Sequence, residues 1–129
     1  MKLLTVFLDA SVVLSGLISS TGGSGKLLKA GAKNKIKLVI TEKIVLEMVT
    51  QLRKVRVQRK TLAHLLSSRT IRIISTPNEE KIGKFLPVLD DPDDAHVLAG
   101  AVVAGADVLV SLDKKHILTP RVKRTLKPI

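Results

Sequence analysis

The acidic residues of this chain are few, and their positions suggest chemistry. Among the 11 Asp and Glu residues, Asp9 directly follows one short apolar run and Asp113 comes just after another. Glu47 falls in the first two turns of a predicted helix. Four further carboxylates stand at the start of a long apolar stretch: Asp90, Asp91, Asp93 and Asp94.

Carboxylates that are brought together repel one another, and the pKa of at least one rises unless a cation is present. The chain has no Cys and only three His, so an all-oxygen site is expected. Mg²⁺ and Mn²⁺ are the natural partners of such a site. A metal held in this way suits phosphoryl or phosphodiester chemistry, because it activates water and neutralises charge on the phosphate.

Structural roles are the main alternative for each of these acids. Asp9 and Asp113 could each be the N-cap of a following helical segment, although we favour the site. Glu47 stays open between the site and an exposed helix face, because Glu42 lies on the same predicted helix. Helix capping or solvated charge is favoured for the other acids of the central cluster: Asp90, Asp91 and Asp93.

Short runs rich in Val, Ile and Leu predict the strands that position these acids. The runs span residues 4–8, 36–40, 71–74 and 107–110. Most lack polar alternation, which is typical of parallel strands buried on both faces. Helical patterns lie between them, so the sequence predicts an α/β sandwich around a mostly parallel sheet. The acids would then gather at the carboxyl ends of the strands, where such sheets bind ligands.

Several helix signals sharpen this outline. Thr41 is a candidate N-cap, and further helices are predicted over about 57–67 and 78–86. The central helix begins at Asp91-Pro92 and ends at Gly105. We interpret TGGSGK, at 21–26, as a flexible connection because it fails the phosphate-loop pattern at two positions.

The charge balance points to an anionic partner. There are 22 Lys and Arg residues against 11 acids, a formal charge of +11. With only two Phe and no Tyr or Trp, base stacking would contribute little, and phosphate contacts would dominate. The expected contacts to a nucleic-acid backbone are Arg53, Lys54, Arg56 and Lys114.

Targeting signals are weak. Asp9 interrupts the N-terminal apolar run too early for a signal-peptide core. The stretch 95–110 is shorter than a membrane span. We therefore expect one domain over residues 1–129 in a cytoplasmic protein.

Three segments resemble the motifs of PIN-domain ribonucleases. VFLDASVVLSGL is similar to the family's first motif and aligns Asp9 and Ser11 with it. ITEKIVLEM resembles the second motif and selects Glu47 over Glu42. The stretch DDPDDAHVLAGAVVAGADVLVSLDKKHIL resembles the third and fourth motifs. It departs from them at Leu112, where family members often have Gly, and the chain's last residues lack the aromatic helix of many members.

The resemblance implies a three-layer α/β/α fold and a Mg²⁺- or Mn²⁺-dependent endoribonuclease that cleaves single-stranded RNA. It implies four catalytic acids, namely Asp9, Glu47, Asp94 and Asp113. The metal ligands would be Asp9, Asp94 and Asp113, with Ser11 and Ser111 as supporting polar groups. Within the family, the chain resembles the toxins of type II toxin–antitoxin systems, which implies a small antitoxin partner and a homodimer.

Two other functions stay open. The chain could be a catalytically inactive nucleic-acid-binding module on the same fold, or a scaffold that acts by pairing with a protein. His96 is two residues beyond Asp94, and because a helix turns about 200° over two residues we favour a structural role for it.

Overall fold

The central element of the molecule is a four-stranded parallel sheet. The computed structural model describes residues 2–88 and 94–112. The strands are β1 (Thr5–Leu8), β2 (Lys37–Thr41), β3 (Ile71–Ile74) and β4 (Val108–Val110), in the order β3-β2-β1-β4. In the register of the sheet, Val6 is paired with both Leu38 and Val108. β1 is thus flanked on both sides, and β3 is an edge strand.

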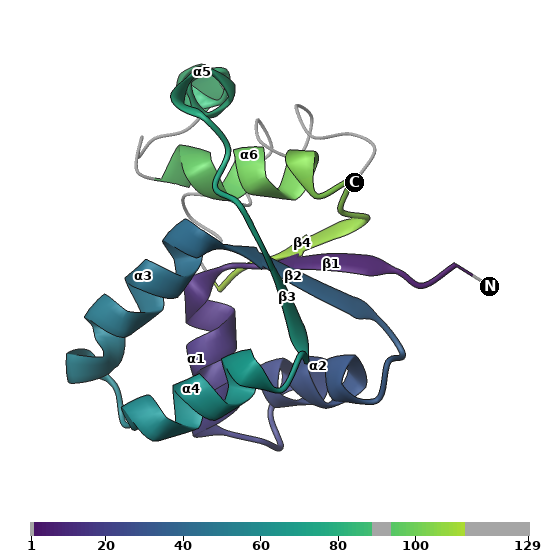
Figure 1. Ribbon diagram of the computed structural model, residues 1–129, viewed down its shortest axis with the longest axis vertical. Helices are drawn as coiled ribbons and strands as arrows, with labels where there is room; N and C mark the ends of the chain where they lie inside the picture. Colours follow the sequence, from purple (N-terminus) through teal and green to yellow (C-terminus); the bar gives the residue numbers. More distant parts are fainter. Residues whose placement is uncertain (1, 89–93, 113–129) are drawn as a thin grey trace.

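Helices cover both faces of the sheet, as Figure 1 shows. One layer contains α1 (Ala10–Ile18), α2 (Gly23–Ala32), α3 (Glu42–Gln51) and α4 (Arg59–Ser67). The other layer contains α5 (Glu79–Gly83) and α6 (Ala95–Val103), and two short 3₁₀ turns are η1 (Leu52–Lys54) and η2 (Leu86–Val88). The three-layer α/β/α prediction is confirmed.

The core explains why the strands are apolar on both sides. The side chains of Phe7, Leu8 and Ile40 are completely buried between the two helical layers. α6 is apolar nearly all round and its residues 95–101 are all buried, as expected of a helix at the centre of a fold. Gly100 lets this helix approach the sheet closely, because a Cβ there would lie 2.6 Å from Cζ of Phe7.

The predicted strands agree with the structure to within a residue or so at each end, and 71–74 agrees at both ends. The predicted N-cap Thr41 accepts a hydrogen bond from Ile44 N–H at 3.3 Å, so α3 begins as expected. Gly105, with φ of +64°, follows the C-cap residue Ala104 of α6 and adopts the left-handed conformation that glycine tolerates. The predicted start at Asp91-Pro92 lies outside the described residues.

The segment 21–26 differs from its prediction. α2 begins at Gly23, so the last four residues of TGGSGK form the first turn of a helix. Gly25 is buried where a Cβ would come within 2.5 Å of the backbone oxygen of Ser19. This glycine therefore serves the close turn between α1 and α2, and its conformational freedom is not used for a flexible linker.

Within the described part of the chain, no helix has both the length and the apolar character needed to cross a membrane.

Candidate active site

The carboxyl end of β1 carries the first acid of the site. Asp9 follows Leu8 directly and is the N-cap of α1, with its Oδ1 accepting a hydrogen bond from Ala10 N–H at 2.6 Å. The extended backbone of Asp9, at φ −80° and ψ 159°, is the conformation expected of an N-cap residue. The change from strand to helix therefore places this carboxylate at the edge of the sheet.

The neighbouring strand β4 supplies a second polar group. Asp9 N–H donates to the carbonyl of Val110 at 3.2 Å, which joins the two strand ends. The next residue, Ser111, is 5% exposed and its Oγ donates to Oδ2 of Asp9 at 2.9 Å. The capping role of Asp9 therefore does not exclude a role in a site, because one carboxylate oxygen caps α1 while the other contacts Ser111.

Glu47 and His96 meet between the two helical layers. Nε2 of His96, on α6, lies 2.9 Å from Oε1 of Glu47, on α3. His96 is 2% exposed, and the side chain of Glu47 is 36% exposed. Glu42, the competing acid on α3, is exposed in the first turn. The side chain that turns toward α6 is therefore that of Glu47.

The contact between Glu47 and His96 is electrostatic and leaves polar atoms unsatisfied. Within the described residues, neither Oε1 of Glu47 nor Nδ1 of His96 has a hydrogen-bond partner, although both atoms are buried. Oγ of Ser11, in the first turn of α1, is also buried without one. Buried polar groups without a partner are costly and mark places where an ion or a water belongs.

Burial raises the pKa of Asp9 above its ordinary value of 3.8, because the charged form is poorly solvated there. Hydrogen bonds from Ser111 and from Ala10 N–H oppose this rise. The charge of Glu47 adds to it, and His96 opposes it. Glu47 and His96 therefore lie near enough to Asp9 to act on the charge of its carboxylate.

Asp94 directly precedes α6, and its Oδ2 is buried. Figure 1 shows the beginning of α6 on the same side of the molecule as the beginnings of α1 and α3. No three His, Asp or Glu residues among those described converge tightly enough to hold an ion by themselves. The donors present nevertheless fit a divalent cation, because they are carboxylates, whose oxygens Mg²⁺ and Mn²⁺ prefer.

The other predicted site residues either lie on η1 and the turn after it or fall outside the described residues. Arg53 and Lys54 are exposed in η1, and Arg56 is exposed just after it. Several predicted positions lie outside the described residues: Asp90, Asp91, Asp93, Asp113 and Lys114.

His96 is the residue of the site that sequence reasoning undervalued. The 200° separation from Asp94 suggested that the two side chains diverge, and the contact with Glu47 comes from a different helix. One signal could have identified it. His96 is the only polar side chain in a helix that is otherwise apolar all round, so it must be buried and must find a partner.

Comparisons with known proteins agree with this fold. A family model described as the PIN domain matches residues 5–115. The fold is similar to the crystal structure of VapC20 from Mycobacterium tuberculosis, described as a Sarcin-Ricin loop cleaving toxin. That match has a TM-score of 0.59 and 17% sequence identity, and it covers 85% of this chain and 91% of that one. No curated protein sequence matches the chain.

Proposed function

The chain belongs to the PIN-domain family, and on this premise we propose that it is a metal-dependent endoribonuclease that cleaves single-stranded RNA. The proposal is supported by two contacts near the carboxyl edge of the sheet, one between Ser111 and Asp9 and the other between His96 and Glu47. This is the edge where sheets of this type bind ligands. The same edge carries Asp94 at the start of α6.

In this proposal, Asp9, Asp94 and Asp113 hold Mg²⁺ or Mn²⁺, and Glu47 completes the site. The bound ion supplies an activated water and neutralises charge on the phosphodiester. Both oxygens of Asp9 accept a hydrogen bond, yet each keeps a lone pair for an ion, since a carboxylate oxygen has two. The carboxylate of Glu47, held by His96, is a further donor group.

Two polar partners of the acids have positioning roles. Ser111 fixes the orientation of the Asp9 carboxylate through its hydrogen bond to Oδ2. His96 holds Glu47 at the site, because its ring is buried in α6 and cannot move away. Such partners of metal ligands typically contribute about 10- to 100-fold in metal affinity or activity.

The nuclease is tested by incubating the purified chain with single-stranded RNAs of varied sequence. We expect cleavage with Mn²⁺ or Mg²⁺, none with a chelator, and loss of at least about 100-fold in rate for Asp94→Asn. Salt-sensitive RNA binding without metal-dependent cleavage of any RNA would instead favour an inactive binding module.

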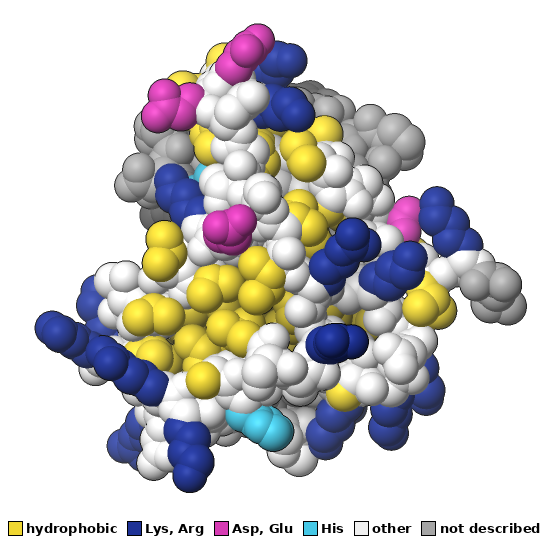
Figure 2. Space-filling view, viewed as in Figure 1, with side chains coloured by type: hydrophobic (Ala, Val, Ile, Leu, Met, Phe, Trp, Pro, Cys, Tyr) yellow, Lys and Arg dark blue, Asp and Glu magenta, His cyan; other side chains and the backbone are white. Residues whose placement is uncertain are grey.

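We further propose that the chain is the toxin of a toxin–antitoxin pair, supported by the described activity of the structural neighbour. The partners would be RNA, a small antitoxin protein and a second copy of the chain. Figure 2 shows hydrophobic side chains gathered where α3, α4 and β3 meet. Leu46 and Val49 of α3 and Ile73 of β3 are among the exposed large hydrophobic residues, and such exposure supports a protein contact.

Expression in a bacterial host separates the toxin from a general nuclease. We expect growth arrest from the wild-type chain and normal growth from the Asp94→Asn variant at equal protein level. Arrest by both proteins would show that toxicity does not depend on the proposed site.

A further inference from the structure

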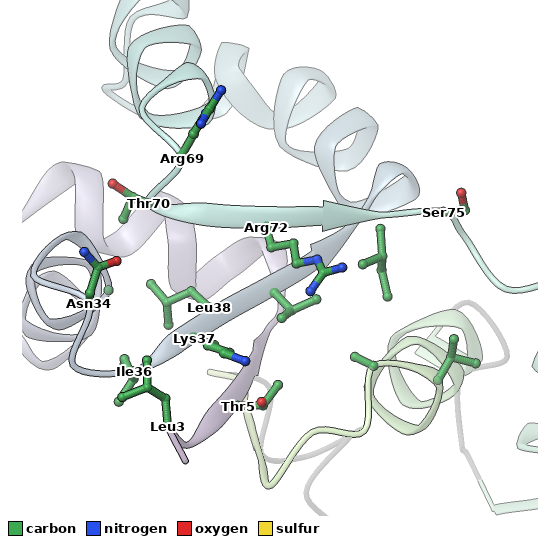
Figure 3. A pocket seen from close by; sticks show the side chains of 15 residues that line it. Leu3, Thr5, Asn34, Ile36, Lys37, Leu38, Arg69, Thr70, Arg72 and Ser75 are labelled. Carbon is green, nitrogen blue, oxygen red and sulfur yellow. The ribbon is translucent and has the colours of Figure 1, made fainter. Parts of the chain in front are cut away.

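The face of the sheet beside α6 is not fully covered. α6 packs over β1 through Phe7 and over the end of β2 through Thr41, as the surroundings of Gly100 show. Next to it lies a cavity of about 620 Å³, which we call the sheet-face cavity (Figure 3). The cavity is lined by residues at the beginnings of β1 and β2, by residues along β3, and by the C-terminal end of α6. Its volume is within the range of ligand sites, about 300–1,000 Å³.

Two basic side chains occupy strand positions that would normally pack against a helix. Arg72 on β3 is paired with Val39 on β2, and Lys37 is two residues before Val39, so both basic residues are on one face of the sheet. Figure 3 shows Lys37, Arg72 and the hydroxyl of Thr5 projecting into the cavity from three adjacent strands. The side chain of Arg69, which also lines the cavity, points away from them.

The basic side chains of the cavity outnumber the carboxylates near it in the described part of the chain. The residues that line the cavity include Lys37, Arg69 and Arg72 but no Asp or Glu. Neither Lys37 nor Arg72 forms an ion pair with any residue in 2–88 or 94–112. The carboxylate of Asp107 is next to the cavity, where it accepts the backbone N–H of Thr5 at 2.8 Å, and it offsets only part of this positive charge. Like charges on neighbouring strands of one face repel, so an anion in the cavity would stabilise the arrangement.

The segment 113–129, which lies outside the described residues, has the wrong charge to occupy the cavity. Residues 113–129 contain six Lys and Arg residues against one Asp. Charge complementarity therefore favours an anionic occupant over this basic segment.

We propose that the sheet-face cavity binds the phosphate backbone of the single-stranded RNA substrate at a distance from the cleavage site. This inference rests on the proposed function. The N-terminal end of α6 contacts the active site through His96, while its C-terminal end lines the cavity, so one helix separates the two. An RNA strand that runs along α6 would contact the carboxylate centre and the cavity at the same time. Lys37 and Arg72 would contact phosphates, and the apolar floor would contact sugars.

The test compares two doubly substituted proteins with the same change in charge. Lys37→Gln/Arg72→Gln removes both basic groups of the cavity. Lys26→Gln/Lys29→Gln removes two exposed lysines of α2, on the opposite side of the sheet, and is the matched control. Both pairs are introduced into full-length Asp9→Asn protein, so that a fluorescent single-stranded RNA is bound but not cut. The dissociation constant is measured by anisotropy over a range of salt concentrations.

We expect the cavity variant to bind the RNA about 10-fold more weakly than its Asp9→Asn parent. The control variant should bind less than about threefold more weakly than the same parent. The salt dependence should also become shallower by about 1.4 in log–log slope, the value for two lost phosphate contacts on a single strand. In the cleaving background, the cavity variant should raise KM for a long RNA and leave kcat unchanged. Equal melting temperatures would show that both variants fold.

Equal weakening of binding in the two variants would overturn the proposal, as would an unchanged KM. The two proposals fail differently. Metal-dependent cleavage with no special role for Lys37 and Arg72 would refute the cavity proposal and support the nuclease proposal. If the wild-type protein never cleaves RNA but binds it in a way that depends on Lys37 and Arg72, the nuclease proposal would be refuted and the cavity proposal supported.

Discussion

At the scale of single residues, the carboxylate of Asp9 connects a structural and a chemical role. One oxygen caps α1 and the other accepts from Ser111, so strand β1, helix α1 and strand β4 all depend on its position. The same burial that fixes the group raises its pKa. A side chain so constrained is well suited to meet a cation without reorganising.

The stability of the metal-free protein should depend on the charge of Asp9. The pKa of Asp9 in the fold is above its value of 3.8 in an unfolded chain. Its contribution to stability is therefore largest below about pH 3.8 and is lost as the pH rises through the raised value. Asp9→Asn, which keeps a good N-cap, should raise the melting temperature at neutral pH, and the gain should shrink as the pH falls toward 4.

Thermal unfolding with a chelator present checks this expectation. Adding Mn²⁺ should then stabilise the wild-type protein more than the variant, by about 2.7 kcal/mol when the ion is at 100 times its dissociation constant. A variant that melts below the wild-type protein at neutral pH in chelator would contradict the account of Asp9.

The contact between His96 and Glu47 makes a separate prediction. His96→Leu keeps most of the buried volume but removes the polar contact, and should weaken Mn²⁺ binding by about 10- to 100-fold. His96→Gln keeps an N–H donor and should lose less. Calorimetric titration of Mn²⁺ into RNA-free protein measures this directly. If the Leu variant binds Mn²⁺ as tightly as the wild type, His96 serves packing alone.

At the scale of helices and strands, α6 connects the core to the site. Its apolar residues pack on the sheet, while His96 in its first turn contacts Glu47 of α3, and Asp94 directly precedes it. The position of these two side chains therefore depends on how closely α6 lies on β1. Gly100 controls that distance, because a Cβ there would press on both Phe7 and Thr41.

Gly100→Ala tests the close approach of α6. A Cβ would lie 2.6 Å from Cζ of Phe7 and 2.9 Å from Cγ2 of Thr41, two side chains that are fully buried. The overpacking should lower the free energy of unfolding by about 1–3 kcal/mol, even though Ala is the better helix former. Urea unfolding in chelator measures the loss.

Gly83→Ala, in α5, is the control, because no atom lies within 4 Å of the added Cβ. It should leave stability unchanged or raise it by up to about 1 kcal/mol. A Gly100→Ala protein that is as stable as the Gly83→Ala protein would mean that α6 shifts freely on the sheet.

The strands and the central helix could be predicted from sequence because burial on two faces leaves a continuous apolar run. The structure of TGGSGK could not be predicted, because glycine occurs both in flexible segments and where two parts of the backbone pack closely. Only the structure shows that Gly25 belongs to the second case, beside the backbone of Ser19. The pair formed by Glu47 and His96 was also beyond prediction. The pair depends on which turns of α3 and α6 face each other. The sequences of two helices that are far apart in the chain do not indicate this.

At the scale of the whole molecule, the charges are separated. The four proposed acids account for four of the 11 carboxylates, which leaves seven against 22 Lys and Arg residues. A basic surface around an acidic centre attracts a polyanion while the centre holds a cation. The exposed Arg53, Lys54 and Arg56 and the sheet-face cavity lie on different parts of this surface, so the distribution supports an extended substrate.

The central claim is that the carboxylates at the edge of the sheet form a metal-dependent ribonuclease centre. The most direct measurement is the single-turnover cleavage rate of one single-stranded RNA as Mn²⁺ is titrated, with the wild-type and Asp9→Asn proteins side by side. We predict that the wild-type rate rises to saturation with Mn²⁺ and falls to background in chelator, while the variant is slower by at least about 100-fold at every concentration. Cleavage that persists in chelator, or an Asp9→Asn protein that cuts at the wild-type rate, would contradict this account.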